Sequence, residues 1–162
     1  DTDRSRGLGD VYKRQLLYYA DRRVHMQSKV LPALNEGRWV ISDRFADSTM
    51  AYQYYGYDKR VPKETLEQLY AMTVGDFHPD LTVILDIDPQ KGLARSLKRN
   101  GSAAEQEIRF ESRELAFHEN LRRGFLEIAE SAPRYAVLDA DKSVDELHRE
   151  IVKITEERLM HK

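Results

Sequence analysis

The chain has 162 residues, which is enough for one domain with a substantial core. Its 26 lysine and arginine residues nearly balance its 28 aspartate and glutamate residues, and the formal net charge of −2 argues against nonspecific nucleic-acid binding through bulk charge. The absence of cysteine excludes a disulfide framework and thiolate metal sites. No apolar stretch is long enough to cross a bilayer and no signal-peptide pattern opens the chain, so we expect a cytoplasmic protein without a membrane or nucleic-acid partner.

Residues 1–15 differ in character from the rest of the chain. They hold four basic residues and several small polar ones, without an apolar period of either kind. We interpret them as a non-native or disordered leader and expect the folded domain over residues 16–162. The segment Gly7-Leu8-Gly9 is not expected to bind phosphate, because no strand precedes it and no Gly-Lys-Ser/Thr follows it.

Predicted helices and strands alternate after residue 15. Apolar spacing and turn residues indicate helices at 16–35, 47–55, 62–74, 88–100, 108–131 and from 144 onward. Short apolar runs indicate buried strands at Trp39–Ser42, Leu81–Ile87 and Tyr135–Asp139. Ser143 and Glu146 have the spacing of a capping box at the start of the last helix. This order predicts an α/β fold in three layers, with a parallel sheet between helices.

An Asp-Arg pair follows the first predicted strand. Ligands bind beyond the carboxyl ends of parallel strands, and Asp43 and Arg44 lie at such an end. The planar fork of Arg44 suits a phosphate because it can donate two parallel hydrogen bonds. A bare Asp-Arg pair is more often a surface salt bridge. Here a site is favoured by polar side chains at helical spacing behind the pair, which are Ser48, Thr49, Tyr52 and Gln53.

Acidic residues also follow the other two predicted strands. Asp86 and Asp88 come at the end of the second strand, and Asp139 and Asp141 at the end of the third. Such acids often cap the following helix, and we assign that role to Asp88.

Together these segments resemble thymidylate kinase, a nucleoside monophosphate kinase of the phosphate-loop class. The resemblance covers residues 16–162 and rests on the order and spacing of Tyr18-Tyr19-Ala20-Asp21-Arg22, Ser42-Asp43-Arg44-Phe45, Gly75-Asp76-Phe77-His78-Pro79-Asp80, Arg109-Phe110-Glu111 and Leu138-Asp139-Ala140. It implies transfer of the terminal phosphate of ATP to dTMP with Mg²⁺, giving dTDP and ADP. It also implies a homodimer in the intact family member.

The resemblance implies roles at the base and at the phosphate of dTMP. Tyr18 would stack on thymine, at a position where the family more often has phenylalanine. Arg22 would donate to a carbonyl oxygen of the base. Arg44 would hold the dTMP phosphate, with Asp43 beside it near the magnesium and the phosphates.

Further roles are implied for the polar cluster. Ser48 and Thr49 would read the other base edge. Tyr52 would lie under the sugar and exclude a 2′-hydroxyl, and Gln53 would extend that wall. Without the resemblance, Tyr18 and Tyr52 would be interpreted as ordinary core aromatics.

A lid is expected over residues 95–109, because phosphoryl transfer needs a flap that brings cations and excludes water. Arg109 would stabilise the phosphate in transfer, although Ile108 stands where the family often has aspartate. Arg95 would stack on adenine, and Arg99 flanks the loop, where a solvated helix charge is an alternative. Adenine would also lie near the end of the third strand, at Asp139, Ala140 and Asp141.

The sequence contains no Gly-x-x-x-x-Gly-Lys-Ser/Thr and no Glu-Pro-Gly-Gly segment. The expected sheet is therefore of the phosphate-loop kinase type but lacks its first strand and the phosphate loop. Without that loop, its lysine and its magnesium ligand, we expect this polypeptide to be inactive alone.

Three alternatives remain open at this stage. The chain could be a kinase for another deoxynucleoside monophosphate, such as dGMP or dAMP, because the Asp-Arg signature is shared among these enzymes. It could instead be a noncatalytic nucleotide-binding module. Nucleic-acid binding near Arg14–Arg23 is the weakest alternative, since a core or dimer helix explains that segment more simply.

Overall fold

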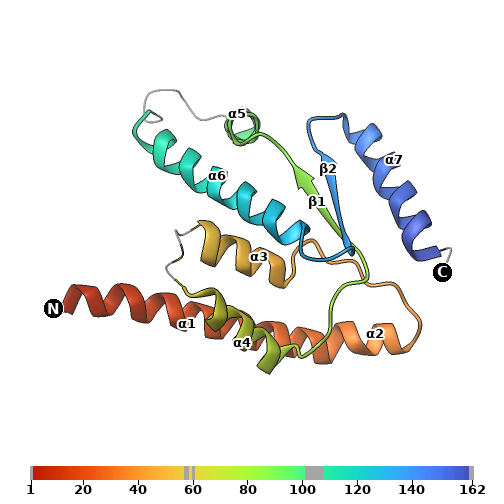
Figure 1. Cartoon of the computed structure of the whole chain (residues 1–162), viewed down its shortest axis with the longest axis horizontal. Coiled ribbons are helices and arrows are strands. Elements are labelled where there is room, and N and C mark those ends of the chain that lie inside the picture. The colour runs from red at the N-terminus through yellow and green to blue at the C-terminus, as the bar shows by residue number, and fades with distance from the viewer. Residues whose placement is uncertain (1, 57–58, 60, 101–107, 161–162) are drawn as a thin grey trace. The chain divides into compact units, whose positions relative to one another are not determined.

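The structure is a computed structural model that describes residues 2–56, 59, 61–100 and 108–160 (Figure 1). The chain divides into two compact units, Asp1–His78 and Pro79–Lys162, and each is described separately. No helix in the described ranges is long and apolar enough to span a membrane.

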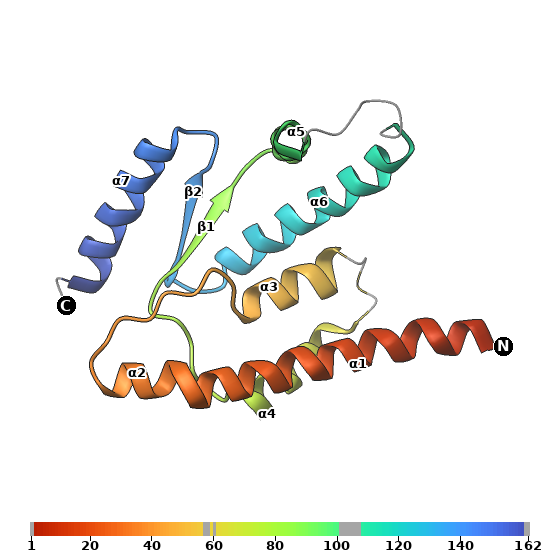
Figure 2. The same cartoon turned by 180° about the vertical axis from the view of Figure 1, so that it is seen from behind.

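The first unit is helical. Helices α1, η1 and α2 form one long rod, and α3, η2 and α4 follow it in the chain (Figures 1 and 2). The elements are α1 (Thr2–His25), η1 (Met26–Val30), α2 (Leu31–Asn35), α3 (Ala46–Met50), η2 (Ala51–Gly56) and α4 (Lys63–Thr73). The widened turn of η1 comes just before Pro32, which has no N–H to donate and crowds the carbonyl four residues earlier.

The structure differs from the sequence-based expectation at the start of the rod. The first helix begins at Thr2 rather than near Leu16, and Gln15 is fully buried. Whether residues 1–15 are a leader stays a prediction, as does the assignment of residues 16–162 to one domain with a lid. The core of this unit forms around Tyr19, Val61 and Leu66, where α1 packs against α4.

The predicted strand at Trp39–Ser42 is wrong. These residues are irregular, and the side chains of Trp39 and Ile41 are 62% and 93% exposed. A strand forms only where ladder hydrogen bonds join it to a neighbour. Within the described residues the sheet has two strands, and neither pairs with this segment.

The second unit is α/β. Its elements are β1 (Thr82–Asp86), α5 (Pro89–Asn100), α6 (Ile108–Ala129), β2 (Tyr135–Asp139), α7 (Val144–Thr155) and η3 (Glu156–Met160). The two strands pair in parallel, from Thr82 opposite Tyr135 to Asp86 opposite Asp139. Helices α6 and α7 lie on opposite sides of this pair in both views (Figures 1 and 2). The predictions of both strands are confirmed.

The capping box at the start of α7 is also confirmed. The Glu146 backbone N–H donates to Ser143 Oγ over 3.3 Å, and the Ser143 backbone N–H donates to Glu146 Oε2 over 3.0 Å. Two backbone donors that have no partner inside the helix are thereby satisfied.

Candidate functional site

A pocket with a volume of about 420 Å³ lies within the first unit, between the middle of α1 and the segment around α3. All seven residues that we predicted to bind the substrate line it. The lining residues are Tyr18, Asp21, Arg22, His25, Arg44, Phe45, Ser48, Thr49, Tyr52 and Gln53. The structure thus brings the predicted set together, although it does not test the role of each member.

Helical spacing explains the α1 wall of the pocket. Tyr18, Arg22 and His25 lie four and three residues apart and therefore share one face of the helix. Tyr19 lies on a different face of α1, and it is only 2% exposed, as is Met26 at the start of η1. The same helix can therefore be anchored in the core and still present polar groups to the pocket.

Arg22 is the most constrained cation of the pocket. Its Nη2 donates to Thr49 Oγ1 over 2.8 Å, whereas its Nη1 is buried and has no hydrogen-bond partner in the described part of the chain. Burial lowers the pKa of Arg22, because the charged guanidinium loses contact with water. A buried donor without a partner is costly, so this atom is available to an acceptor on a ligand.

Arg44 is held more loosely. Its Nη2 donates to the Tyr52 hydroxyl over 3.4 Å, and its guanidinium carbon lies 5.1 Å from the centre of the Tyr52 ring. The long hydrogen bond and the exposed setting leave this cation free to turn toward an anion. The neighbouring Asp43 is exposed and does not line the pocket.

Sequence reasoning missed three polar residues of this region. Asp21 and His25 line the pocket, and their spacing of three and seven residues from Tyr18 is the signal that could have found them. Gln15 donates from Nε2 to Gln53 Oε1 over 2.6 Å, and both side chains are buried. This contact joins residues that are 38 positions apart in sequence, and no local pattern predicts it.

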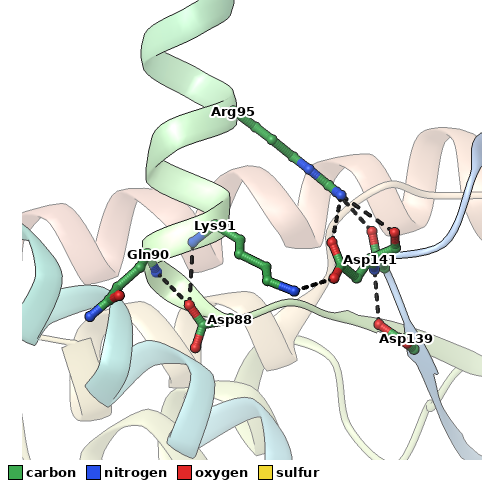
Figure 3. A network of polar contacts seen from close by, with 7 residues as sticks. Asp88, Gln90, Lys91, Arg95, Asp139 and Asp141 are labelled. Carbon is green, nitrogen blue, oxygen red and sulfur yellow. Dashed lines mark hydrogen bonds and ion pairs between the residues drawn. The ribbon is translucent and has the colours of Figure 1, made fainter.

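The second unit holds a polar network at the end of β2 (Figure 3). Arg95 donates from Nη1 to the Ala140 carbonyl over 2.9 Å and from Nη2 to Asp141 Oδ1 over 2.8 Å. Lys91, one turn earlier in α5, forms an ion pair with the other carboxylate oxygen of Asp141. Hydrogen bonding from Lys91 lowers the pKa of Asp141. Lys91 is absent from the predicted site, although its spacing of four residues from Arg95 places both cations on one helix face.

The acids at the strand ends have structural partners. Asp88 accepts the backbone N–H groups of Gln90 over 3.0 Å and Lys91 over 3.3 Å, which confirms its predicted role as a helix cap. Asp139 Oδ1 accepts the Asp141 backbone N–H over 2.9 Å. Asp86 accepts two hydrogen bonds from one side chain, at 2.7 Å from Arg122 Nε and 2.8 Å from Arg122 Nη2.

The predicted lid lies largely outside the described residues. The description omits residues 101–107, and the side chains of Arg99 and Arg109 are also outside it. Their predicted contacts with adenine and with the phosphate in transfer stay predictions.

Comparison with known proteins places these two units in one family. The profile of the thymidylate kinase family matches residues 5–151. A thymidylate kinase of Bradyrhizobium sp. (strain ORS 278) is 43% identical over 145 residues, which are 89% of this chain and 62% of that protein. A second one, from Nitratidesulfovibrio vulgaris (strain DSM 19637 / Miyazaki F), is 42% identical over 140 residues, 85% of this chain and 64% of that protein.

A solved structure agrees with these matches. The crystal structure of thymidylate kinase from Ehrlichia chaffeensis superposes with a TM-score of 0.68 at 28% identity, over 90% of this chain and 66% of that one. The fold is therefore that of a phosphate-loop nucleoside monophosphate kinase. The chain belongs to the thymidylate kinase family, and it spans less than two thirds of the length of these relatives.

Proposed function

We propose that this chain carries the dTMP site and part of the ATP site of an enzyme that phosphorylates dTMP. In the reaction, an oxygen of the dTMP phosphate attacks the terminal phosphorus of ATP, and the bond from that phosphorus to the ADP oxygen breaks. The products are dTDP and ADP. The observation that carries the proposal is the convergence of all seven predicted substrate-binding side chains on one pocket.

The chemistry of Arg22 supports a base with a carbonyl group at this position. A guanidinium can only donate hydrogen bonds. The buried Nη1 can therefore donate to the 4-oxo group of thymine, whereas the 4-amino group of cytosine is itself a donor and cannot accept from it. The Thr49 hydroxyl already accepts from Arg22 and retains a lone pair for the ring N–H of thymine. Guanine also has a carbonyl group, so dGMP is the competing substrate, whereas adenine has an amino group there.

Tyr18, Arg44 and Tyr52 complete the proposed contacts with the nucleotide. The half-exposed ring of Tyr18 offers a face for stacking on the base. Arg44 turns from Tyr52 to the phosphate, where a charge-assisted bond replaces the long contact with the hydroxyl. Tyr52 forms the wall under the sugar and favours deoxyribose. Ser48 and Gln53 extend the polar wall.

In the second unit, Arg95 is proposed to stack on the adenine of ATP beside Asp139, Ala140 and Asp141. Its hydrogen bonds lie along the edge of the guanidinium, and the side chain is 54% exposed, which suits stacking on its flat face. Arg109 is proposed to stabilise the phosphate in transfer, with Asp43 near the phosphates and Arg99 at the edge of the lid.

Magnesium is part of the proposed reaction, since the family uses ATP with Mg²⁺. Among the described residues, however, no three histidine, aspartate or glutamate side chains come together as a metal site. These residues therefore do not supply a complete set of ligands for the ion.

A homodimer in the cytoplasm is also proposed. The support for self-association is an apolar stripe on α1, where Leu17 and Val24 are 62% and 63% exposed and lie on one face, two turns apart. Analytical ultracentrifugation of the chain and of Leu17→Lys tests this proposal. A monomer at every concentration would contradict it.

Calorimetric titration of the chain with nucleotides tests the proposed substrate. We expect dTMP to bind at least about tenfold more tightly than dCMP or dAMP, because an amino group leaves Arg22 Nη1 without an acceptor. Arg44→Met should reduce the affinity for dTMP toward that for thymidine, which has no phosphate. Arg38→Met, at an exposed arginine outside the pocket, is the matched control. Equal affinity for these three nucleotides, or no binding of dTMP, would contradict the proposal.

A further inference from the structure

The guanidinium of Arg22 lies over the faces of two aromatic rings. Its central carbon lies 4.9 Å from the centre of the Tyr19 ring and 5.5 Å from the centre of the Phe45 ring. Both distances are within the range of about 6 Å over which a ring face attracts a cation. Tyr19 comes from the preceding turn of α1, whereas Phe45 comes from the segment directly before α3.

The two aromatic faces stabilise this cation through its charge and leave the hydrogen atoms of Nη1 without an acceptor. A carboxylate partner would accept hydrogen bonds from the guanidinium, whereas a ring attracts it through the π face. The result is the arrangement seen here, in which Arg22 Nη1 is buried and unpaired. Burial also raises the pKa of the Tyr19 hydroxyl, so this ring is a neutral phenol near pH 7.

Phe45 itself packs against two further aromatic rings. It makes edge-to-face contacts with Tyr70, at 6.4 Å and 85°, and with Phe77, at 6.2 Å and 74°. The Tyr70 hydroxyl donates to the Phe77 carbonyl, which ties these two supports together. Such geometry fixes the orientation of the Phe45 face, because edge-to-face pairs restrict how a ring can turn.

We propose that Phe45 is a positioning residue for base selection: it holds the Arg22 guanidinium so that Nη1 points at a carbonyl group of the bound base. Phe45 thereby contributes to the preference for a 4-oxo over a 4-amino pyrimidine. This inference rests on the proposed function, in which the base of dTMP fills the pocket.

The test compares dTMP with 5-methyl-dCMP, which carries an amino group in place of the 4-oxo group. In Phe45→Leu the apolar volume stays but the π face is lost. We expect the ratio of its affinities for dTMP and 5-methyl-dCMP to decrease by a factor of about 2 to about 30, which corresponds to the loss of a cation–π contact. Affinity for 5-methyl-dCMP should change little. Phe45→Tyr keeps the face and should keep the preference, and Phe117→Leu makes the same substitution in the second unit as a control.

The ratio of the two affinities separates positioning from general loosening of the pocket. If Phe45→Leu weakens both ligands equally, or leaves the preference intact, the inference is wrong. Phe45→Met, which fills the site with a flexible apolar chain, replaces Phe45→Leu if circular dichroism shows that the latter is unfolded. If the unmodified chain binds dTMP no better than 5-methyl-dCMP, the proposed function fails instead.

Discussion

Replacing Thr49 by valine tests whether the Arg22–Thr49 hydrogen bond organises the pocket. The hydroxyl accepts from Arg22 Nη2 over 2.8 Å, and Thr49 is 8% exposed. Valine keeps the branched shape but removes the acceptor, so a second guanidinium nitrogen loses its partner beside the unpaired Nη1. Leaving such a donor unsatisfied costs about 1–3 kcal/mol. Because Nη2 lies at a pocket that water can enter, we expect the lower part of this range, about 1 kcal/mol.

Urea unfolding followed by circular dichroism measures this loss. Thr49→Ser retains the hydroxyl and should recover most of the free energy of unfolding. Thr65→Val makes the same substitution in α4, outside the pocket, and should leave the free energy within about 0.5 kcal/mol.

A double-mutant cycle adds a direct measure of the pair. Thr49→Val should cost much less when Arg22 is already methionine, giving a coupling of about 0.5–3 kcal/mol. If Thr49→Val is as stable as the unmodified chain, or if the two substitutions add without coupling, the hydrogen bond does not hold Arg22 and the reasoning is refuted.

Three further predictions follow from other parts of the chain. The 162-residue polypeptide should transfer no measurable phosphate from ATP to dTMP in an assay coupled to ADP release, because its sequence contains no phosphate loop. Steady turnover would contradict this. Ser143→Ala should lower the free energy of unfolding by about 0.5–2 kcal/mol, measured in urea, through loss of the cap on α7; an unchanged midpoint would count against it. Since Lys91 lowers the pKa of Asp141, their stabilising contact is complete above the ordinary aspartate pKa of about 3.9 and is lost as the pH falls through the lowered value. Asp141→Asn should therefore weaken the pH dependence of stability on the acid side, and an identical curve would exclude the contact.

Local spacing and the resemblance to the family together predicted the walls of the pocket. The spacing indicated the polar cluster from Ser48 to Gln53, whereas Tyr18 and Arg22 were predicted from the resemblance. Tyr18 and Arg22 are four residues apart on one helix, and Thr49 and Tyr52 are three residues apart in the next helical segment. Each spacing fixes a shared face before any tertiary contact is known. That the two faces meet is shown by the structure, whereas the roles of the side chains in binding remain predictions.

Contacts between distant segments could not be predicted in this way. Arg22 reaches Thr49 across 27 positions of sequence, and Lys91 reaches Asp141 across 50. A side chain at such a distance finds its partner only after the backbone has folded. The resemblance to the family placed Asp141 near a nucleotide, but the ion pair that fixes it depends on Lys91, to which the resemblance assigned no role.

The correct helices and the wrong strand at Trp39–Ser42 have the same physical origin. A helix satisfies its N–H and C=O groups within its own segment, so the residues of that segment largely decide whether it forms. A strand depends on a neighbour for the same groups, and an apolar run alone does not provide one. In Tyr135–Asp139 the neighbour is β1, and the prediction succeeds. At Trp39–Ser42 no described residue supplies the ladder, and the apolar side chains stay exposed. Arg44 follows this unpaired segment, so the position of its guanidinium depends on the pocket residues that contact it, above all Tyr52, rather than on a paired strand before it.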